Sequence, residues 1–401
     1  MKYVVILGDG MADEPIESLG GQTPLAYAKT PVMDELARKG EIGLAHTIPK
    51  GMSPGSDTAN LSVLGYNPRQ YYTGRSPLEA LSIGVDMEDS DVALRCNLVT
   101  LTEEDAPYSQ QKILDHSSGE ISTEDAKILL KAVADELADE TYQFYVGTSY
   151  RHCLIWKKGK VEELTPPHDV LTQCIQEYLP GDSHLRHMQE RSYEILKNHP
   201  LNQERKAKGL NPANSLWFWG AGTRPALSSF EEAHQKKGAM ISAVDLLKGI
   251  AVGAGMDNIL VEGANGGLHT NYEGKAQAAV KALTKDGYDF VYIHVEAPDE
   301  MGHQGSVERK VQSIEYLDER VIRLVKEGLD KAGADYRMLI MPDHPTPIRL
   351  RTHTTSPVPY LIYDSTDKKE RTWRYQEDQA AESGNEFAHG WDVMKHLFQE
   401  I

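Results

Sequence analysis

The chain has 401 residues, which is enough for two or three domains with substantial cores. Its 60 acidic residues against 42 basic ones give a net charge of −18, so we predict no nucleic-acid partner, because that affinity depends on basic surface. No apolar run approaches the roughly 18 residues of a membrane span, so no membrane contact is predicted, and three scattered cysteines without a C-x-x-C motif favour a reducing cytoplasm.

The first predicted element is a buried parallel strand over residues 3–7, which leads into Gly8-Asp9-Gly10. In open α/β sheets, ligands gather at the carboxyl ends of the strands. Asp9 would lie at that edge and is a candidate metal ligand. A turn-forming Asp-Gly pair is the alternative interpretation.

Residues 51–60 place Ser56 between a turn rich in glycine and proline and a predicted helix start. Ser56 or Asp57 would cap that helix. A serine in this position can lie beside free backbone N–H groups, which suits an oxyanion or a phosphate. An ordinary capping serine in a loop is the alternative.

Near residue 90 the pattern changes, and a new strand is predicted over residues 91–101. A helix with a capping box follows from Ser122 or Thr123, and two short strands around a turn occupy residues 144–156. This sequence of elements predicts a small α+β module. Polar loops of the module carry His116, Arg151 and His152, and clusters of histidine and arginine suit a carboxylate or phosphate substrate.

The C-terminal half alternates between strands and helices again. A strand and glycine loop at residues 215–225 ends with Arg224, and a long helix is predicted over residues 307–331. Further strands are predicted over residues 290–295, 339–341 and 358–363, the last at a sheet edge because of its prolines. Strands alternating with helices on both sides of the module predict one parallel α/β sheet that the module interrupts.

Asp/His motifs follow these C-terminal strands. Asp299 and His303 are spaced i, i+4, which puts both on one face of a helical turn. Asp343 and His344 come directly after a strand, and His353 lies in a loop. With Asp9 they form a mixed Asp/His set, which suits zinc, manganese or iron better than calcium. Together with Ser56, they are what two adjacent metals sharing a serine nucleophile require.

This set of residues resembles that of the alkaline phosphatase superfamily. The chain is more closely similar to the archaeal-type cofactor-independent phosphoglycerate mutases, over essentially its full length. The motifs that carry this resemblance are Gly8-Asp-Gly-Met, Gly55-Ser-Asp, Pro298-Asp-x-x-Gly-His, Pro342-Asp-His-Pro-Thr-Pro, Asp115-His-Ser-Ser-Gly, Tyr150-Arg-His and Asn271-Tyr-Glu-Gly-Lys.

The resemblance implies an alkaline-phosphatase-like core with a parallel sheet and helices on both faces, plus an inserted smaller α+β domain. We place the core at residues 1–92 and 213–401 and the inserted domain at residues 93–212. The inserted domain would bind substrate and act as a lid that excludes water.

The resemblance also implies a role for each site residue. One metal would be held by Asp299, His303 and His353, and the other by Asp9, Ser56, Asp343 and His344. Ser56 would be the nucleophile that forms a phosphoserine. The glycerate part of the substrate would meet His116, Arg151 and His152, and the phosphate would lie near Arg224 and Lys275.

The implied activity is the interconversion of 3-phosphoglycerate and 2-phosphoglycerate, without bisphosphoglycerate. Its cofactors would be two divalent metal ions, manganese first, with zinc, magnesium or cobalt as alternatives. The expected partner is a small phosphorylated carboxylate, and the oligomeric state stays open.

Three other functions fit the same motifs. The first is a homoserine kinase or another phosphotransferase on the same scaffold, although the chain has no P-loop motif for ATP. The second is a metal-dependent phosphatase or sulfatase that admits water to the serine. The third is a metal-binding protein without catalytic activity.

Overall fold

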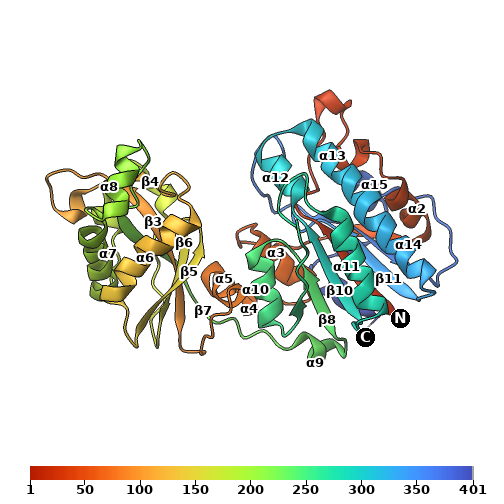
Figure 1. Ribbon diagram of the computed structural model, residues 1–401. Helices are drawn as coiled ribbons and strands as arrows, with labels where there is room; N and C mark the ends of the chain where they lie inside the picture. Colours follow the sequence, from red (N-terminus) through yellow and green to blue (C-terminus); the bar gives the residue numbers. More distant parts are fainter. Residues whose placement is uncertain (400–401) are drawn as a thin grey trace. The chain divides into compact units, whose positions relative to one another are not determined.

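The computed structural model describes residues 1–399, which fold into two compact units (Figure 1). The core unit comprises Met1–Tyr72 and the residues from Leu227 onward, and the inserted unit comprises Thr73–Ala226. The inserted unit is therefore wider than the expected residues 93–212. It is wider because the helix α5 (Arg75–Ser82) packs on two strands of that unit's sheet, β3 (Val92–Leu101) and β7 (Ser215–Thr223).

The core unit is built on an eight-stranded sheet in the order β13-β2-β12-β11-β1-β10-β8-β9. The strand β1 (Lys2–Gly8) is central, and it runs parallel to β10 (Phe290–Val295) on one side and to β11 (Tyr336–Met341) on the other. The remaining strands are β8 (Gly238–Ile241), β9 (Asp257–Asn258), β12 (Val358–Asp364), β2 (Glu41–Ala45) and β13 (Glu386–Phe387). Only β12 runs antiparallel to its neighbours β11 and β2.

Helices cover both faces of this sheet, which confirms the predicted fold class (Figure 1). On one face, alternate strand residues such as Val4, Ile6 and Ile293 pack against four helices: α2 (Pro31–Lys39), α11 (Tyr272–Thr284), α13 (Val307–Leu317) and α14 (Arg323–Lys331). The opposite face meets α3 (Ser56–Val63), α10 (Asp245–Gly253) and α16 (Asp392–Phe398). The central strands are largely apolar because they are buried on both sides.

The prolines of β12 predicted an edge strand, and that prediction was wrong. β12 lies inside the sheet, between β2 and β11. Its pairing with β11 begins only at Leu361, so Pro357 and Pro359 precede that ladder and remove no hydrogen bond from it.

The long predicted helix of residues 307–331 is continuous. It consists of α13, a short π-helical segment at Asp318–Ile322 and α14. Asp318 in this segment accepts hydrogen bonds from the backbone N–H groups of Val32 and Met33, so it caps α2 from a distant part of the chain.

The inserted unit has a five-stranded antiparallel sheet in which β3 pairs with β6 (Arg151–Trp156), β7 and β4 (Ile113–Asp115). A two-residue turn links β5 (Tyr142–Thr148) to β6, with Ser149 at a positive φ of 55°. The helices α6 (Thr123–Leu137) and α7 (Ser183–Leu196) pack on the sheet, and α8 (Pro200–Ala207) follows them. None of the helices within residues 1–399 is long and apolar enough to cross a membrane.

The order of the core strands brings distant motifs together. β1 ends just before Asp9, β11 just before Asp343, and β10 just before the helix α12 (Ala297–His303), which carries Asp299. These three strands are neighbours and parallel, so their carboxyl ends meet at one edge of the sheet.

Candidate metal centre

The first part of the centre consists of Asp299, His303 and His353. The two imidazole Nε2 atoms lie 3.0 Å apart, and each is 3.2 Å from an oxygen of Asp299. Both Nδ1 atoms contact main-chain carbonyls, that of His303 at Arg351 and that of His353 at Pro54. A carbonyl only accepts, so each Nδ1 carries the hydrogen and each Nε2 is left available as a ligand.

The second part consists of Asp9, Asp343, His344 and Ser56. The Nε2 atom of His344 lies 3.0 Å from Ser56 Oγ, 3.6 Å from Asp9 Oδ1 and 3.4 Å from Asp343 Oδ2. The ligand atoms of Asp9, Asp343 and His344 all lie within 4.8 Å of one another, as do those of Asp299, His344 and His353. His344 therefore belongs to both groups by distance, whereas the resemblance assigned it to only one.

The position of Ser56 is fixed by its own helix turn. Ser56 is the first residue of α3, and the capping residue is Gly55, so the expected cap at Ser56 or Asp57 was wrong. The Ser56 hydroxyl is thus free of a capping bond and faces His344. Asn60, one turn later, donates both to the Ser56 carbonyl and to Asp343 Oδ2, which links the serine's turn to the end of β11.

Sequence reasoning missed two buried side chains behind this centre. His294 on β10 contacts Asp9 Oδ2 through Nε2 at 2.8 Å and Ser242 Oγ through Nδ1 at 3.2 Å. Tyr292, also on β10, donates to Asn60. The sequence pattern predicted a buried apolar strand for both residues. The signal that could have identified His294 was a histidine within an otherwise apolar run.

Several features fit divalent metal ions. Asp9 Oδ1 is buried and has no hydrogen-bond donor among residues 1–399, whereas Oδ2 is occupied by His294. Burial raises the pKa of Asp9 well above its usual range, and the nearby carboxylates of Asp343 and Asp299 add to this effect. Crowded buried carboxylates of this kind are relieved by a bound cation.

The group formed by Asp299, His303 and His353 also suits a cation. Burial acts to raise the pKa of Asp299, but hydrogen bonds from His303 and His353 outweigh it and hold the pKa well below its usual range. The bond with Asp299 raises the pKa of His303 to about 9. A positive charge beside Asp299 is thus favoured, which a bound metal ion would supply.

In the inserted unit, His116 and Arg151 lie in one cluster of side chains. The Arg151 guanidinium is 5.3 Å from the centre of the Tyr150 ring, and the His116 ring packs edge-on against Tyr150. His168 contacts both His116 and Trp219. Arg151 is exposed, so its charge is available to an anion.

His152 differs from its neighbour in the strand. It is only 4% exposed, and its Nδ1 accepts a hydrogen bond from the Gly147 backbone. Burial lowers the pKa of His152 to about 4, so the ring is neutral at pH 7. Its Nε2 is buried and has no hydrogen-bond partner among residues 1–399, and the substrate contact of His152 stays a prediction.

The two candidate phosphate ligands are placed differently. Arg224 is exposed in the inserted unit and donates to the Met87 carbonyl at 3.0 Å. Lys275 is fully buried in the core unit and donates to the carbonyl of His294, behind the contact between His294 and Asp9. Burial lowers the pKa of Lys275 to about 8. Phosphate contact stays a prediction for both residues.

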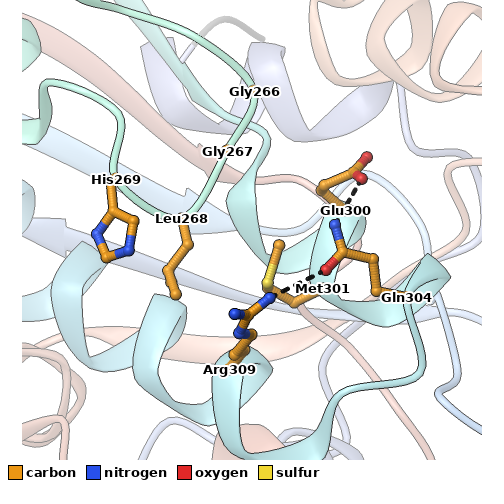
Figure 2. Close-up of a pocket in the computed structure, with 8 residues that line it drawn as sticks. All are labelled: Gly266, Gly267, Leu268, His269, Glu300, Met301, Gln304 and Arg309. Carbon is orange, nitrogen blue, oxygen red and sulfur yellow. Dashed lines mark hydrogen bonds between the residues drawn. The ribbon is translucent and has the colours of Figure 1, made fainter.

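A cavity of about 420 Å³ borders the same helix, α12 (Figure 2). It is lined by Glu300 and Met301 of α12, by Gln304 directly after that helix, by the loop Gly266–His269 and by Arg309. Asp299 and His303 do not line it. The cavity and the candidate metal centre are therefore separate.

Comparison with known proteins agrees with this geometry. A family described as 2,3-bisphosphoglycerate-independent phosphoglycerate mutase matches residues 37–202. The chain is 48% identical to a probable enzyme of that name from Geobacter sulfurreducens, with 99% of both chains covered. It is 50% identical to the enzyme from Methanosarcina barkeri, with 92% of both covered.

Solved structures give the same answer. A protein from Pyrococcus horikoshii is similar with a TM-score of 0.82 and 31% identity, covering 100% of this chain and 98% of its own. The cofactor-independent phosphoglycerate mutase from Thermoplasma acidophilum has a TM-score of 0.67 and 26% identity, covering 100% and 99%. The fold, the strand-end Asp/His cluster and these full-length similarities lead to one conclusion: the chain belongs to the 2,3-bisphosphoglycerate-independent phosphoglycerate mutases.

Proposed function

We propose that this protein interconverts 3-phosphoglycerate and 2-phosphoglycerate through a phosphoserine at Ser56. The observation that carries the proposal is the position of Ser56 Oγ, 3.0 Å from His344 Nε2 in the Asp/His cluster at the strand ends. A serine hydroxyl is a weak nucleophile by itself and needs such an environment.

Two divalent metal ions, with manganese as first choice, would be held by the two groups of ligands. Asp299, His303 and His353 would form one group, and Asp9, Ser56, Asp343 and His344 the other. When bound, the ions would favour the ionised form of the serine and neutralise charge on the phosphoryl oxygens. Zinc, magnesium and cobalt are alternatives.

Two transfers account for the reaction. The Ser56 hydroxyl loses its proton, and Oγ forms a bond to the phosphorus as the bond from phosphorus to the C3 oxygen of 3-phosphoglycerate breaks. That oxygen takes a proton. The 2-hydroxyl of the retained glycerate then loses its proton and forms a bond to the phosphorus of the phosphoserine, while the bond from phosphorus to Ser56 Oγ breaks and Oγ takes a proton back. No bisphosphoglycerate enters this sequence.

The substrate is a small phosphorylated carboxylate, for which cationic side chains are needed. Arg151 and His116 suit the glycerate carboxylate, because both belong to one cluster and the guanidinium is exposed. The inserted unit would exclude water during the transfer, since water would otherwise hydrolyse the phosphoserine. A cytoplasmic location is proposed from the three free cysteines.

The test is a coupled assay of manganese-loaded protein with 3-phosphoglycerate in the absence of bisphosphoglycerate. Parallel reactions contain homoserine plus ATP, and an aryl phosphate ester in water. Formation of 2-phosphoglycerate, with a phosphate-labelled peptide that contains Ser56, supports the proposal. Phosphohomoserine alone, or free phosphate alone, would replace it with the kinase or the phosphatase function.

A further inference from the structure

A buried ion pair lies beside the metal centre, and no step of the proposed reaction uses it. Lys310 on α13 is fully buried, and its Nζ donates to Asp13 Oδ2 at 2.8 Å. The side chains of Lys310 and Asp13 are 0% and 1% exposed. Burying two charges is costly unless further hydrogen bonds satisfy them, so a pair in this position needs an explanation.

The additional bonds of this pair join two loops that follow neighbouring strands. Lys310 Nζ also donates to the carbonyl of Thr346 at 2.8 Å and to that of Ala12 at 3.3 Å. Asp13 accepts from the Ile348 backbone at 3.2 Å, and Thr346 donates its own N–H to Ala12. The ion pair thus connects the loop after β1 to the loop after β11.

Thr346 connects this ion pair to the metal centre. The Thr346 hydroxyl donates a short hydrogen bond to Asp299 Oδ1. Thr346 Oγ1 also lies 3.3 Å from His344 Nδ1. Thr346 is closely packed against two glycines, Gly10 and Gly302. A Cβ atom at Gly10, which has a φ of 61°, would come within 2.4 Å of Thr346 Oγ1, and one at Gly302 within 2.7 Å of the Thr346 carbonyl.

We propose that Lys310 is a positioning residue for the metal site of Asp299: by holding the Thr346 carbonyl, it aims the Thr346 hydroxyl at Asp299 and so fixes the direction in which that carboxylate can bind a metal. This inference rests on the proposed function, because it takes Asp299 as a ligand. Outer hydrogen bonds of this kind orient carboxylate ligands, and their loss typically lowers metal affinity by about 10- to 100-fold.

The chain offers a matched control in Arg337. This buried cation of the same unit also combines a carboxylate, that of Asp364 at 3.4 Å, with two main-chain carbonyls, those of His396 and Leu397. None of these partners contacts the metal centre. A second control is Arg309, the exposed neighbour of Lys310, which lines the cavity in Figure 2.

The experiment titrates manganese into metal-stripped full-length protein and follows heat and bound-metal stoichiometry. We expect Lys310→Met to weaken one of the two sites by about 10-fold or more and the other by less than threefold. Arg337→Met and Arg309→Met should leave both affinities as in the wild type. In a His303→Ala background, which already lacks the site of Asp299, Lys310→Met should have no further effect.

Lys310→Met leaves Asp13 as an unpaired buried charge and can reduce folding. Thr346→Val therefore serves as a second variant, because it removes the hydroxyl and keeps the side-chain shape. We expect it to weaken the same site as Lys310→Met does, and Thr346→Ser, which keeps the hydroxyl, to retain most of the wild-type affinity.

The outcomes separate this inference from the proposed function. If wild-type protein binds no manganese and forms no 2-phosphoglycerate, the proposed function fails. If wild-type protein binds two ions and both Lys310→Met and Thr346→Val bind them equally well, only the positioning role is wrong. Equal weakening of both sites in Lys310→Met and in Arg337→Met would also overturn it, since that result indicates a loss of stability alone.

Discussion

The candidate metal centre of the core unit and the cationic cluster of the inserted unit are built in different ways. Asp9, Asp343 and His344 are no more than 2% exposed, and each contacts a second polar side chain or the backbone. In the inserted unit, Arg151 is exposed and its contact is with the face of an aromatic ring. The difference indicates that one region fixes its groups in place while the other keeps its charges in water.

This difference has a physical reason. Groups that must meet a small ion or a reacting phosphorus need fixed positions, which buried side chains held by hydrogen bonds provide. Groups that attract an anion act through charge at longer range and can stay solvated until the substrate arrives. The comparison therefore predicts large effects from changes in the core unit and smaller, concentration-dependent effects in the inserted unit.

The largest expected effect comes from Ser56→Ala. Without the hydroxyl there is no acceptor for the phosphoryl group, so mutase activity should fall by at least about 10⁴-fold. The assay is the coupled conversion of 3-phosphoglycerate, together with mass spectrometry of the phosphopeptide. Ser53→Ala, an exposed serine in the same loop, is the control. Normal turnover of the Ser56 variant would show that another residue is the nucleophile.

The next largest effect concerns the first ligand group. His303→Ala removes a nitrogen that lies 3.2 Å from Asp299, so one manganese site should weaken by about 100-fold or more. Equilibrium dialysis of metal-stripped protein measures the stoichiometry. His269→Ala, which changes a histidine that lines the separate cavity, should bind metal normally. Two ions bound at wild-type affinity in the His303 variant would remove this residue from the ligand set.

A smaller effect is expected for the cationic cluster. Arg151→Ala should raise KM for 3-phosphoglycerate by about 10- to 100-fold, the range for one lost hydrogen bond to a charged group. Metal binding should stay unchanged. Steady-state kinetics measures this, with Arg191→Ala, an exposed arginine of the same unit paired with Glu136, as control. A loss of kcat with unchanged KM would instead mean that Arg151 acts on the transition state.

His152 tests the same comparison with a buried residue of the inserted unit, because it follows Arg151 in the chain yet is buried and neutral. His152→Asn should therefore lower thermal stability, by about 1 to 3 kcal/mol, and leave KM within threefold of the wild type. Thermal unfolding and kinetics of the same sample test this. A tenfold rise in KM at unchanged stability would instead support the substrate contact that the resemblance implies for His152.

The smallest effect concerns pH. Burial raises the pKa of Glu377 in the core unit to about 7, from about 4.5 in an unfolded chain. The folded state therefore keeps a proton that the unfolded state releases, so this contribution to stability is full below about pH 4.5 and is lost as the pH rises through 7. Glu377→Gln should flatten the stability profile in that window by about 1 to 2 kcal/mol.

Urea unfolding at several pH values measures this effect. Glu382→Gln, an exposed residue of the same helix α15 (Glu377–Glu382), should leave the profile unchanged. A profile that is equally steep with and without Glu377 would assign the pH dependence to other groups.

The sequence by itself determined the strands and the residues that follow them. The apolar runs at β1, β10 and β11 and the polar residues directly after them identified Asp9, Asp299, Asp343 and His344 as a set, because parallel strands end at one edge. The position of Ser56 at a helix start followed from the glycine and proline before it. Local patterns of this kind depend on neighbours in the chain, so they are visible without a fold.

Only the tertiary structure decided how those side chains are held. The contact of His294 with Asp9 spans 285 residues and that of Lys310 with Asp13 spans 297 residues, so no local pattern predicts either. The place of β12 inside the sheet depends on where its ladder with β11 begins, which its prolines alone do not reveal. The burial of His152 and Lys275 likewise depends on the elements packed over them. The residue types that a reaction needs can be recognised in short motifs, whereas burial and hydrogen-bond partners arise from contacts between distant parts of the chain.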